Sequence, residues 1–409
     1  MVDCDIRDPA LAEAGKRRID WAFQSMPVLQ FIRKQFIKTQ PLAGLRIAAC
    51  LPVTTETANL MVTLRDAGAQ LTLCASNPLA TQDDVAASLV NDFNISTYAQ
   101  KGEPANLSLL ADSQPDLAVD SGYQLAHALH ALGHRAAEII GGTEDSVQGE
   151  SQLKTLAAAG TLAYPVVSVH DATTQHFFDN RYGTGQSTID GVLRATNILL
   201  AGMNLVVSGY GWCGRGVASR ARGLGANVIV TEIDPIKALE ALMDGYRVMS
   251  MGEAAALGDV FITVTGNKSV ITREHFDKMK SGAILCNSGH FNVEIDLETL
   301  DKMTSARRAM RESVEEFALR DGRRLYVLGE GRLFSEGHPA SVMDMSFANH
   351  ALCIQYLVAN RGKLEKGVFP VPEAIDREVA RMKLDSMGVK IDRLTPEQER
   401  YLDGRSAGG

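Results

Sequence analysis

The sequence predicts an α/β protein in which parallel sheets are covered by helices, and three observations lead to this fold class. Short apolar runs recur along the chain and end in polar or glycine-containing turns, with stretches of helical spacing between them. A glycine-rich turn joins one such run to a helical segment. The length of 409 residues is enough for two domains. Strands that alternate with helices favour a parallel sheet with helices on its faces.

The predicted elements alternate in order along the chain. The first half contains strands at 46–51, 70–74, 117–120, 139–142 and 165–169, and helical segments at 56–67 and 83–92. The second half contains a long helix at 188–202, strands at 205–207, 227–231, 259–264, 283–286 and 324–328, and an apolar helix at 339–358. Ligands of parallel sheets bind beyond the carboxyl ends of the strands, so the polar residues after these runs are predicted to form a site.

The segment GYGWCGRG at 209–216 is the most specific signal in the chain. It follows an apolar run and opens a helical segment. Gly209 permits a tight turn, Gly211 lets the backbone approach a pyrophosphate, and Gly214 lets the helix pack closely on the strand. A glycine motif in this context predicts dinucleotide binding.

Glu232 completes the dinucleotide motif. It ends the next apolar run, 227–231, where a ribose-binding acid belongs, and an acid there favours NAD over NADP because it repels a 2′-phosphate. The helix that begins around Trp212 and Cys213 directs unpaired N–H groups and the positive end of its dipole at the phosphates. The sequence therefore predicts a Rossmann unit that binds NAD as cofactor.

Composition and charge limit the classes of function. The formal net charge of −8 argues against a nucleic-acid partner, because such a partner needs a basic face. No apolar run reaches the length of a membrane span, and the N-terminus has no apolar signal core. The six cysteines are scattered without a CxxC pair, which predicts reduced thiols, no metal site and a cytoplasmic location.

Several motifs together resemble the S-adenosylhomocysteine hydrolase family, from about residue 5 to 403. They are FDNRYGTGQST at 178–188, GYGWCGRG, TEIDP at 231–235, CNSGHFN at 286–292 and GHP at 337–339. The resemblance implies a substrate-binding domain at 1–183 completed by about 340–374, an NAD-binding Rossmann domain at 184–339, and an oligomerisation tail at 375–409. Family members are usually tetramers or dimers, so it also implies a homo-oligomer.

The resemblance implies a reaction sequence on an adenine nucleoside substrate. In the family, bound NAD oxidises the ribose 3′-hydroxyl, and the 3′-ketone acidifies the neighbouring C4′–H. A base removes that proton, the 5′ substituent leaves, water adds, and the ketone is reduced again. The cofactor carries the hard step, and the protein supplies placement and proton transfer.

Residues that match the family's motifs receive roles from the resemblance. The residues around adenine and ribose are Thr54, Glu56, Thr57, Gln82 and His338. Those near the redox centre are Asp179, Asn180 and His290. Those expected at the NAD site are Gly209, Gly211, Trp212, Cys213, Gly214, Glu232, Ser146, Asn267 and Asn287. His290 and His338 each follow a glycine in a loop after a predicted strand, where ligand-binding residues of α/β proteins gather.

The chain departs from the family at positions that handle protons. A family histidine, an aspartate, a glutamate and a lysine are replaced, in that order, by Pro52, Ser121, Asp145 and Gln175. Each lost acid or base typically costs about 10²–10⁴-fold in rate. His176 adjoins the missing lysine and is a candidate replacement base, although successive residues on a strand face opposite sides.

Two consequences of these departures stay open on the sequence. Asp179, His176 and His290 are all candidates for the base that takes the C4′ proton. The loop at 332–338 is shorter than the family's and lacks the asparagine that contacts the nicotinamide amide, which predicts looser cofactor binding.

Three functional hypotheses follow. The favoured one is a dehydratase of a nucleoside antibiotic, of the angustmycin C to angustmycin A type, which uses the elimination half of the family reaction with hydroxide as leaving group. The first alternative is an S-adenosylhomocysteine hydrolase that gives adenosine and homocysteine from a rearranged site. The second is a catalytically silent regulator that binds NAD and nucleoside, against which the retained Asp179, Asn180 and His290 argue.

Overall fold

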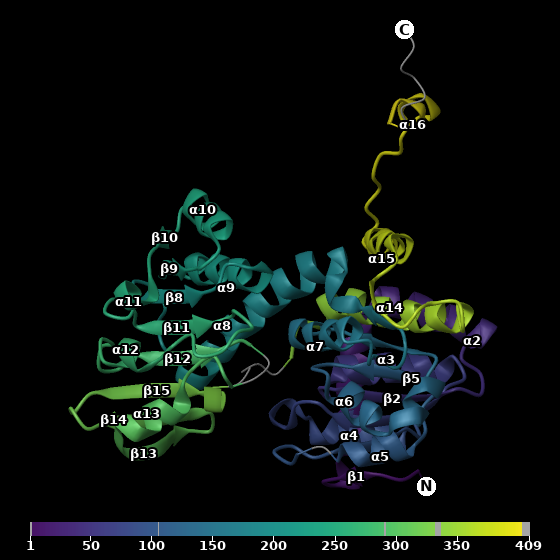
Figure 1. Cartoon of the computed structure of the whole chain (residues 1–409), viewed down its shortest axis with the longest axis horizontal. Coiled ribbons are helices and arrows are strands. Elements are labelled where there is room, and N and C mark those ends of the chain that lie inside the picture. Colours follow the sequence, from purple (N-terminus) through teal and green to yellow (C-terminus); the bar gives the residue numbers. More distant parts are fainter. Residues whose placement is uncertain (1, 105, 290–291, 332–336, 403–409) are drawn as a thin grey trace.

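The computed structural model describes residues 2–104, 106–289, 292–331 and 337–402. Within these residues the chain forms two eight-stranded sheets, each flanked by helices. Figure 1 shows the two helix-covered sheets side by side, with α8 and the segment before it between them. The predicted α/β fold class is confirmed. No helix in the described ranges is both long and apolar enough to cross a membrane.

The first sheet is parallel throughout, with strand order β1-β4-β3-β2-β5-β6-β7-β16. The strands are β1 (Asp5–Ile6), β2 (Arg46–Leu51), β3 (Gln70–Ala75), β4 (Ser96–Ala99), β5 (Leu117–Asp120), β6 (Gly141–Glu144), β7 (Val166–Ser168) and β16 (Val368–Pro370). Because all of them run the same way, their carboxyl ends meet along one edge, which is where ligands of such sheets bind.

Helices enclose this sheet and bury its apolar residues. They are α1 (Ala12–Gln24), α2 (Pro27–Thr39), α3 (Thr55–Asp66), α4 (Asp83–Asn91), α5 (Leu107–Asp112), α6 (Gln124–Ala131), α7 (Val147–Ala158), α14 (Ala340–Ala359) and α15 (Glu373–Ser386). Helix α14 returns from late in the sequence and lies in the largest apolar core beside α2 and α3. It has apolar residues all round, as expected for a buried helix.

The second sheet has the order β10-β9-β8-β11-β12-β15-β14-β13. Its strands are β8 (Asn204–Ser208), β9 (Asn227–Thr231), β10 (Arg247–Val248), β11 (Val260–Thr263), β12 (Ile284–Asn287), β13 (Thr304–Arg311), β14 (Val314–Leu319) and β15 (Arg324–Leu328). Its helices are α8 (Thr184–Thr196), α9 (Trp212–Gly223), α10 (Pro235–Met243), α11 (Met251–Ala254), α12 (Arg273–Phe276) and α13 (Leu297–Met303).

An antiparallel edge, β13 and β14, extends the parallel part of this sheet and was not predicted. Strand β13 is almost wholly exposed and carries three arginines, so it lacks the apolar alternation that marks a strand. Charged side chains on an edge strand oppose further pairing with other chains. The strand therefore has a physical reason to look like a loop in the sequence.

The long helix predicted at 188–202 begins earlier and ends sooner. A π-helical segment, η5 (Gln175–Gly183), leads directly into α8, which ends at Thr196. The next residue, Asn197, has a φ of 55°, and asparagine tolerates this left-handed conformation, which terminates helices. Short 3-10 turns complete the fold: η1 (Pro9–Leu11), η2 (Pro78–Ala80), η3 (Gly133–Glu138), η4 (Val169–Asp171) and η6 (Gly329–Gly331).

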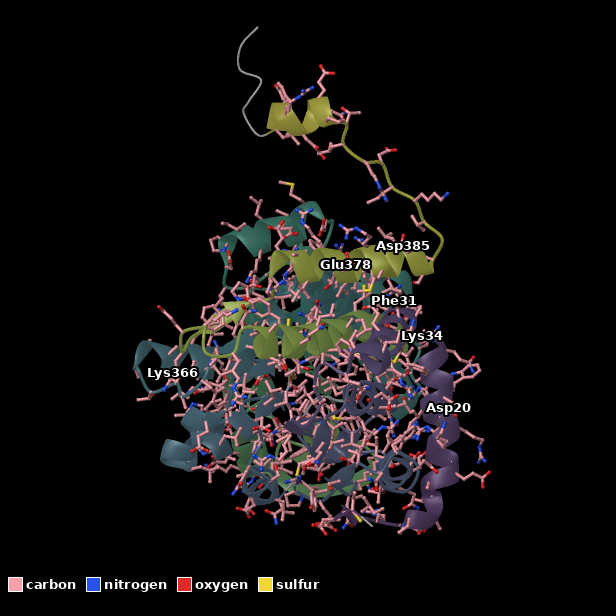
Figure 2. The ribbon with its side chains drawn as sticks, turned by 90° about the vertical axis from the view of Figure 1, so that its right-hand side faces the viewer. Asp20, Phe31, Lys34, Lys366, Glu378 and Asp385 are labelled. Atoms are coloured by element: carbon pink, nitrogen blue, oxygen red, sulfur yellow. The ribbon has the colours of Figure 1, made fainter. Side chains whose placement is uncertain are left out.

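The C-terminal segment leaves the body of the protein after α15. Lys383 ties α15 to α14 through Asp344, with 2.8 Å between Nζ and Oδ2. In Figure 2, α15 with Glu378 and Asp385 lies near Phe31 of α2, and the chain beyond it rises away to α16 (Pro396–Leu402).

Candidate functional site

The carboxyl end of β2 leads into residues predicted to contact adenine and ribose. Thr54 is the N-cap of α3, and its Oγ1 accepts a hydrogen bond from the Thr57 amide at 3.4 Å. Thr57 donates its hydroxyl to the Pro52 carbonyl oxygen at 2.6 Å. Gln82 lies at the start of α4 beside this turn, because its amide donates to the Val53 carbonyl oxygen at 3.0 Å. The structure thus brings Thr54, Thr57 and Gln82 together, and Pro52 contributes a backbone acceptor.

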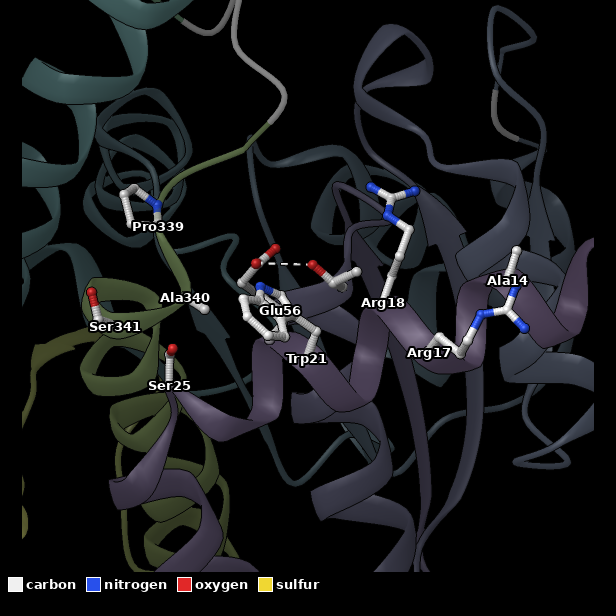
Figure 3. A pocket seen from close by; sticks show the side chains of 11 residues that line it. Ala14, Arg17, Arg18, Trp21, Ser25, Glu56, Pro339, Ala340 and Ser341 are labelled. Atoms are coloured by element: carbon white, nitrogen blue, oxygen red, sulfur yellow. Dashed lines mark hydrogen bonds between the residues drawn. The ribbon is translucent and has the colours of Figure 1, made fainter.

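Glu56, on the first turn of α3, lines a cavity of ≈ 690 Å³ (Figure 3). Helix α1 contributes Arg18 and Trp21 to the cavity wall, and the start of α14 contributes Pro339. The loop before α14 is adjacent, since a Cβ on Gly337 would lie 3.9 Å from Glu56 Oε2. A predicted substrate residue therefore faces open space next to the loop that carries the second predicted histidine.

The π-helix η5 joins predicted site residues that are far apart in the sequence. Asp179 is buried, and its two carboxylate oxygens are bonded separately: Oδ1 lies 2.5 Å from His338 Nδ1, and Oδ2 accepts from Ser346 Oγ at 3.0 Å. Asn180 follows on the same segment and is partly exposed. Single-turn π-helices are rare and occur frequently at functional sites. Asp179 and His338 form a direct pair.

The charge of Asp179 governs the protonation of His338. Burial disfavours the imidazolium, but the charge and hydrogen bond of Asp179, with the charges of Glu56 and Asp145, outweigh it and raise the pKa of His338. The pair can therefore hold a proton beside the residues that follow β2, which is the property that an acid–base group needs.

Two buried carboxylates end the neighbouring strands β5 and β6. Asp120 and Glu144 are register partners and are 3% and 0% exposed. The Glu144 carboxylate accepts hydrogen bonds from three backbone amides, those of Gly122, Tyr123 and Ser146. Burial and the charge of Asp145 nevertheless raise the pKa of Glu144 to about 7. Burial and the charge of Glu144 likewise raise the pKa of Asp120.

The free energy of unfolding is expected to fall between pH 4.5 and about 7. The unfolded Glu144 carboxyl titrates at its ordinary value of 4.5 and the folded one at about 7, so the folded state holds the proton more tightly in this window. The contribution is fully present below the lower value and is lost as pH rises through the upper one. Urea unfolding across this pH range measures the slope. Glu144→Gln is expected to flatten it, and an unchanged slope in that variant would refute the assignment.

Gln175, at the position of the family lysine, lies against Asp145. Its side chain is buried, and Nε2 donates to the Asp145 carbonyl oxygen at 3.1 Å. Within the described part of the chain, Gln175 Oε1 has no hydrogen-bond partner. The Asp145 carboxylate lies 3.5 Å from Nε2 of His350, a buried residue of α14. The structure therefore brings Gln175 and Asp145 together and adds a histidine to them.

His176 lies at the junction between η5 and the nucleotide turn. Its ring stacks on Trp212 with 5.9 Å between centroids and an interplanar angle of 15°, and the His170 ring meets it edge-on at 4.9 Å. Burial lowers the pKa of His176, and burial with the charge of His176 lowers that of His170 to about 4. Both imidazoles are thus neutral near pH 7 and carry a nitrogen that can accept a proton.

The turn after β8 has the shape that its glycines predict. Gly209 has a φ of +101°, a conformation that L side chains rarely adopt. A Cβ on Gly214 would lie 2.0 Å from the Gly209 carbonyl oxygen, so the close packing of α9 on β8 requires glycine. A Cβ on Gly211 would meet no described atom within 4 Å, so this glycine faces open space.

These features fit the pyrophosphate and ribose of NAD. Gly211, the N-cap of α9, has no side chain to bond the first amides of the helix, which leaves them to face the open side. Glu232 directly follows β9, and its Oε2 accepts from the Tyr210 amide at 2.7 Å beside the turn. Each carboxylate oxygen can accept more than one hydrogen bond, so Glu232 keeps capacity for ribose hydroxyls.

Trp212 and Cys213 connect the nucleotide turn to the substrate side. The Phe177 ring of η5 meets Trp212 edge-on with 4.6 Å between centroids. Cys213 Sγ lies 3.7 Å from Thr184 Oγ1, at the start of α8. The predicted cofactor site and the segment that carries Asp179 are therefore contiguous.

The other predicted cofactor residues are more dispersed. Ser146 is the N-cap of α7, and Asn267 lies in an exposed turn after β11. These two regions approach each other, since a Cβ on Gly266 would lie 3.3 Å from Gln148 Nε2. Asn287 is fully buried, and its Nδ2 donates to the Gly331 carbonyl oxygen at 3.0 Å, so its amide supports the loop after β15.

The remaining predictions divide between buried positions and undescribed ones. Ser121 is buried, and its amide donates to the Cys50 carbonyl oxygen at 3.0 Å, which places it directly at the end of β5. His290 lies outside the described residues. Most of the shortened loop, 332–336, also lies outside them.

Sequence reasoning missed His170, His350 and the buried carboxylate Glu144 as members of the site. His170 follows the predicted strand at 165–169, which was a usable signal by the strand-end rule. No local pattern marks His350, because its partner Thr143 is 207 positions away.

Comparisons with known proteins agree with this geometry. The family model described as S-adenosyl-L-homocysteine hydrolase matches residues 3–133, and the one described as its NAD binding domain matches residues 180–340. A relative from Aquifex aeolicus named adenosylhomocysteinase is 56% identical over 100% of both chains. Relatives of the same name from Thermosynechococcus vestitus and Saccharolobus solfataricus are 55% and 52% identical, over 99% and 98% of this chain and 96% and 99% of theirs.

One solved structure shows the same fold at low sequence identity. Dipicolinate synthase from Bacillus halodurans, of which one component was solved, aligns with a TM-score of 0.50 at 14% identity, over 78% of this chain and 99% of its own. At that identity the likeness concerns the fold alone.

Proposed function

The chain belongs to the S-adenosyl-L-homocysteine hydrolase family and has an NAD-binding domain of that family, and we propose that it hydrolyses S-adenosylhomocysteine to adenosine and homocysteine. The observation that carries the proposal is the contact between the nucleotide turn and η5, which sets the Asp179–His338 pair next to the NAD site. The names of relatives above 50% identity support this reaction over the dehydratase that the sequence departures favoured.

In the proposed reaction, NAD supplies the hydride acceptor and donor for the 3′ carbon of the sugar. Asp179 and His338 hold a proton beside the sugar, because their pairing stabilises the imidazolium. Glu56 and Thr57 orient the nucleoside at the end of β2. The neutral rings of His170 and His176 supply proton acceptors on the opposite side of η5, where Trp212 shields them.

A specific observation keeps the dehydratase as a second candidate. Gln175 places a neutral amide, with an unpartnered Oε1 among the described residues, where the family has a proton-transferring lysine. Ser121 and Pro52 also cannot titrate in place of the acid and histidine that they replace. An enzyme that stops after elimination needs fewer proton transfers than one that also adds water, so these positions suit loss of a 5′-side hydroxide.

Product analysis by mass spectrometry separates the two candidates. Purified protein with NAD is incubated with S-adenosylhomocysteine in one tube and with angustmycin C in another. Adenosine and homocysteine in the first tube are the expected products. Loss of water in the second tube with an inert first tube would replace the hydrolase proposal by the dehydratase, and inertness in both would contradict both.

We also propose the domain division and a homo-oligomer. The division is residues 1–183 with about 340–374 for the substrate domain, 184–339 for the NAD domain and 375–409 for the tail, and the separate sheets support it. An oligomer is supported by apolar side chains that are more than half exposed on the projecting tail: Ile391, Leu394, Tyr401 and Leu402. Analytical ultracentrifugation of the full chain and of a chain ending at residue 388 tests the role of the tail.

A further inference from the structure

A stripe of polar residues runs along one face of the otherwise apolar helix α14. Ser346, Asn349 and His350 are spaced so that they share one face of a helix. They are 2%, 0% and 0% exposed, so each needs a partner inside the protein. A buried stripe of this kind marks the side of the helix that faces polar machinery.

Each residue of the stripe contacts the candidate site. Ser346 Oγ donates to Asp179 Oδ2 at 3.0 Å, and Asn349 Nδ2 donates to Thr174 Oγ1 at 2.8 Å, directly before η5. His350 bridges two residues of the β6 end: Nδ1 lies 2.8 Å from Thr143 Oγ1, and Nε2 lies 3.5 Å from Asp145 Oδ2. The stripe thus supports the η5 and β6 sides of the site together.

We propose that His350 is a positioning residue that holds the Asp145 carboxylate in the nucleoside site through its Nε2 atom, an inference that rests on the function proposed above. The Thr143 hydroxyl can donate to Nδ1, which leaves the proton of a neutral ring on Nε2, on the side of Asp145. The 3.5 Å separation is longer than an ordinary hydrogen bond, and it makes Asp145 the acceptor that this N–H faces.

Asp145 is a carboxylate whose placement affects the rest of the site. Its charge helps raise the pKa of His338 and that of Glu144. The neighbouring Gln175 holds the Asp145 backbone through the carbonyl oxygen and brings no positive charge to the carboxylate. His350 reaches the same residue from the opposite element and bonds the side chain instead of the backbone.

Two variants separate the nitrogens of the ring. In His350→Gln the longer side chain places an amide near the position of Nε2 and keeps a donor for Asp145, whereas in His350→Asn the shorter one keeps a group near Nδ1 for Thr143. The dissociation constant of adenosine from the NAD-loaded protein and kcat/KM for S-adenosylhomocysteine are measured for both. We expect His350→Gln to stay within about threefold of the wild type and His350→Asn to lose about 10- to 100-fold, the value of a hydrogen bond to a charged group.

The Asp145→Asn background tests whether the effect passes through the carboxylate. There, His350→Asn is expected to add less than about threefold, because residues that act as a unit are not additive. His275→Gln is the matched control, since this buried histidine caps α12 in the second sheet and should leave adenosine affinity unchanged. Melting temperatures confirm that every variant is folded.

The ranking of the variants decides the proposal. Equal losses in His350→Gln and His350→Asn would indicate packing, and a larger loss in His350→Gln would indicate a role through Thr143; either would overturn the proposal. Wild-type protein that binds adenosine but forms no product would refute the proposed function, while the affinity ranking would still test His350. Failure of the wild type to bind adenosine would overturn both.

Discussion

Asp179→Asn is expected to lower kcat/KM for S-adenosylhomocysteine by about 10²–10⁴-fold, the usual cost of removing an acid–base group. The substitution keeps the size of the side chain and removes the charge that pairs with His338 at 2.5 Å. Because Asp179 contributes to the raised pKa of His338, its loss lowers that pKa. The limb of the pH–rate profile that reports His338 should therefore move to lower pH.

Ser346→Ala is the matched control for this prediction. It removes the hydrogen bond to Asp179 Oδ2 and leaves the carboxylate charge in place. Its rate loss should stay below about tenfold, because a single hydrogen bond to a charged group contributes about 1.5–3 kcal/mol at most. A folded Asp179→Asn protein with activity within tenfold of the wild type would remove Asp179 from the proton-transfer machinery.

Gly211→Ala is expected to abolish tight NAD binding without lowering stability. A Cβ at this position meets no described atom of the protein within 4 Å, so the fold tolerates it. The same open space is where a pyrophosphate approaches the backbone, and the methyl group would occupy it. A loss of at least about tenfold in NAD affinity, or about 1.4 kcal/mol, should appear in calorimetric titration.

Gly214→Ala provides the contrasting result on the same turn. Its Cβ would lie 2.0 Å from the Gly209 carbonyl oxygen, so the turn itself must move. Overpacking of this kind typically costs about 1–3 kcal/mol, and the melting temperature should fall together with NAD affinity. If Gly211→Ala bound NAD as tightly as the wild type, the turn after β8 would not be the pyrophosphate site.

The sequence predicted the parts of the fold that local chemistry determines. The buried strands β2, β3 and β5 are apolar runs with polar ends, and the turn at 209–216 needs glycine for steric reasons that hold in any context. Strand β13 was missed because an exposed, arginine-rich edge has no apolar period. The early start of the helix at η5 was missed because that segment has no amphipathic face.

The candidate site was predictable where motifs carry it and unpredictable where α14 completes it. Asp179 and His338 were both named from motifs, but their direct contact required the return of α14 to the first sheet. His350 lies in a helix whose sequence indicates burial on every side. Long-range contacts of this kind depend on packing between elements, which periodicity in a single sequence does not encode.

Exchange of the C4′ hydrogen of adenosine with solvent is the measurement that tests the proposed chemistry most directly. The protein with NAD is incubated with adenosine in heavy water, and the recovered nucleoside is analysed by mass spectrometry and NMR. NAD-dependent oxidation at C3′ acidifies C4′–H, so deuterium should appear at C4′ in the wild type and be strongly reduced in Asp179→Asn. Recovery of unlabelled adenosine from folded, NAD-bound wild-type protein would contradict the proposed oxidation of the sugar.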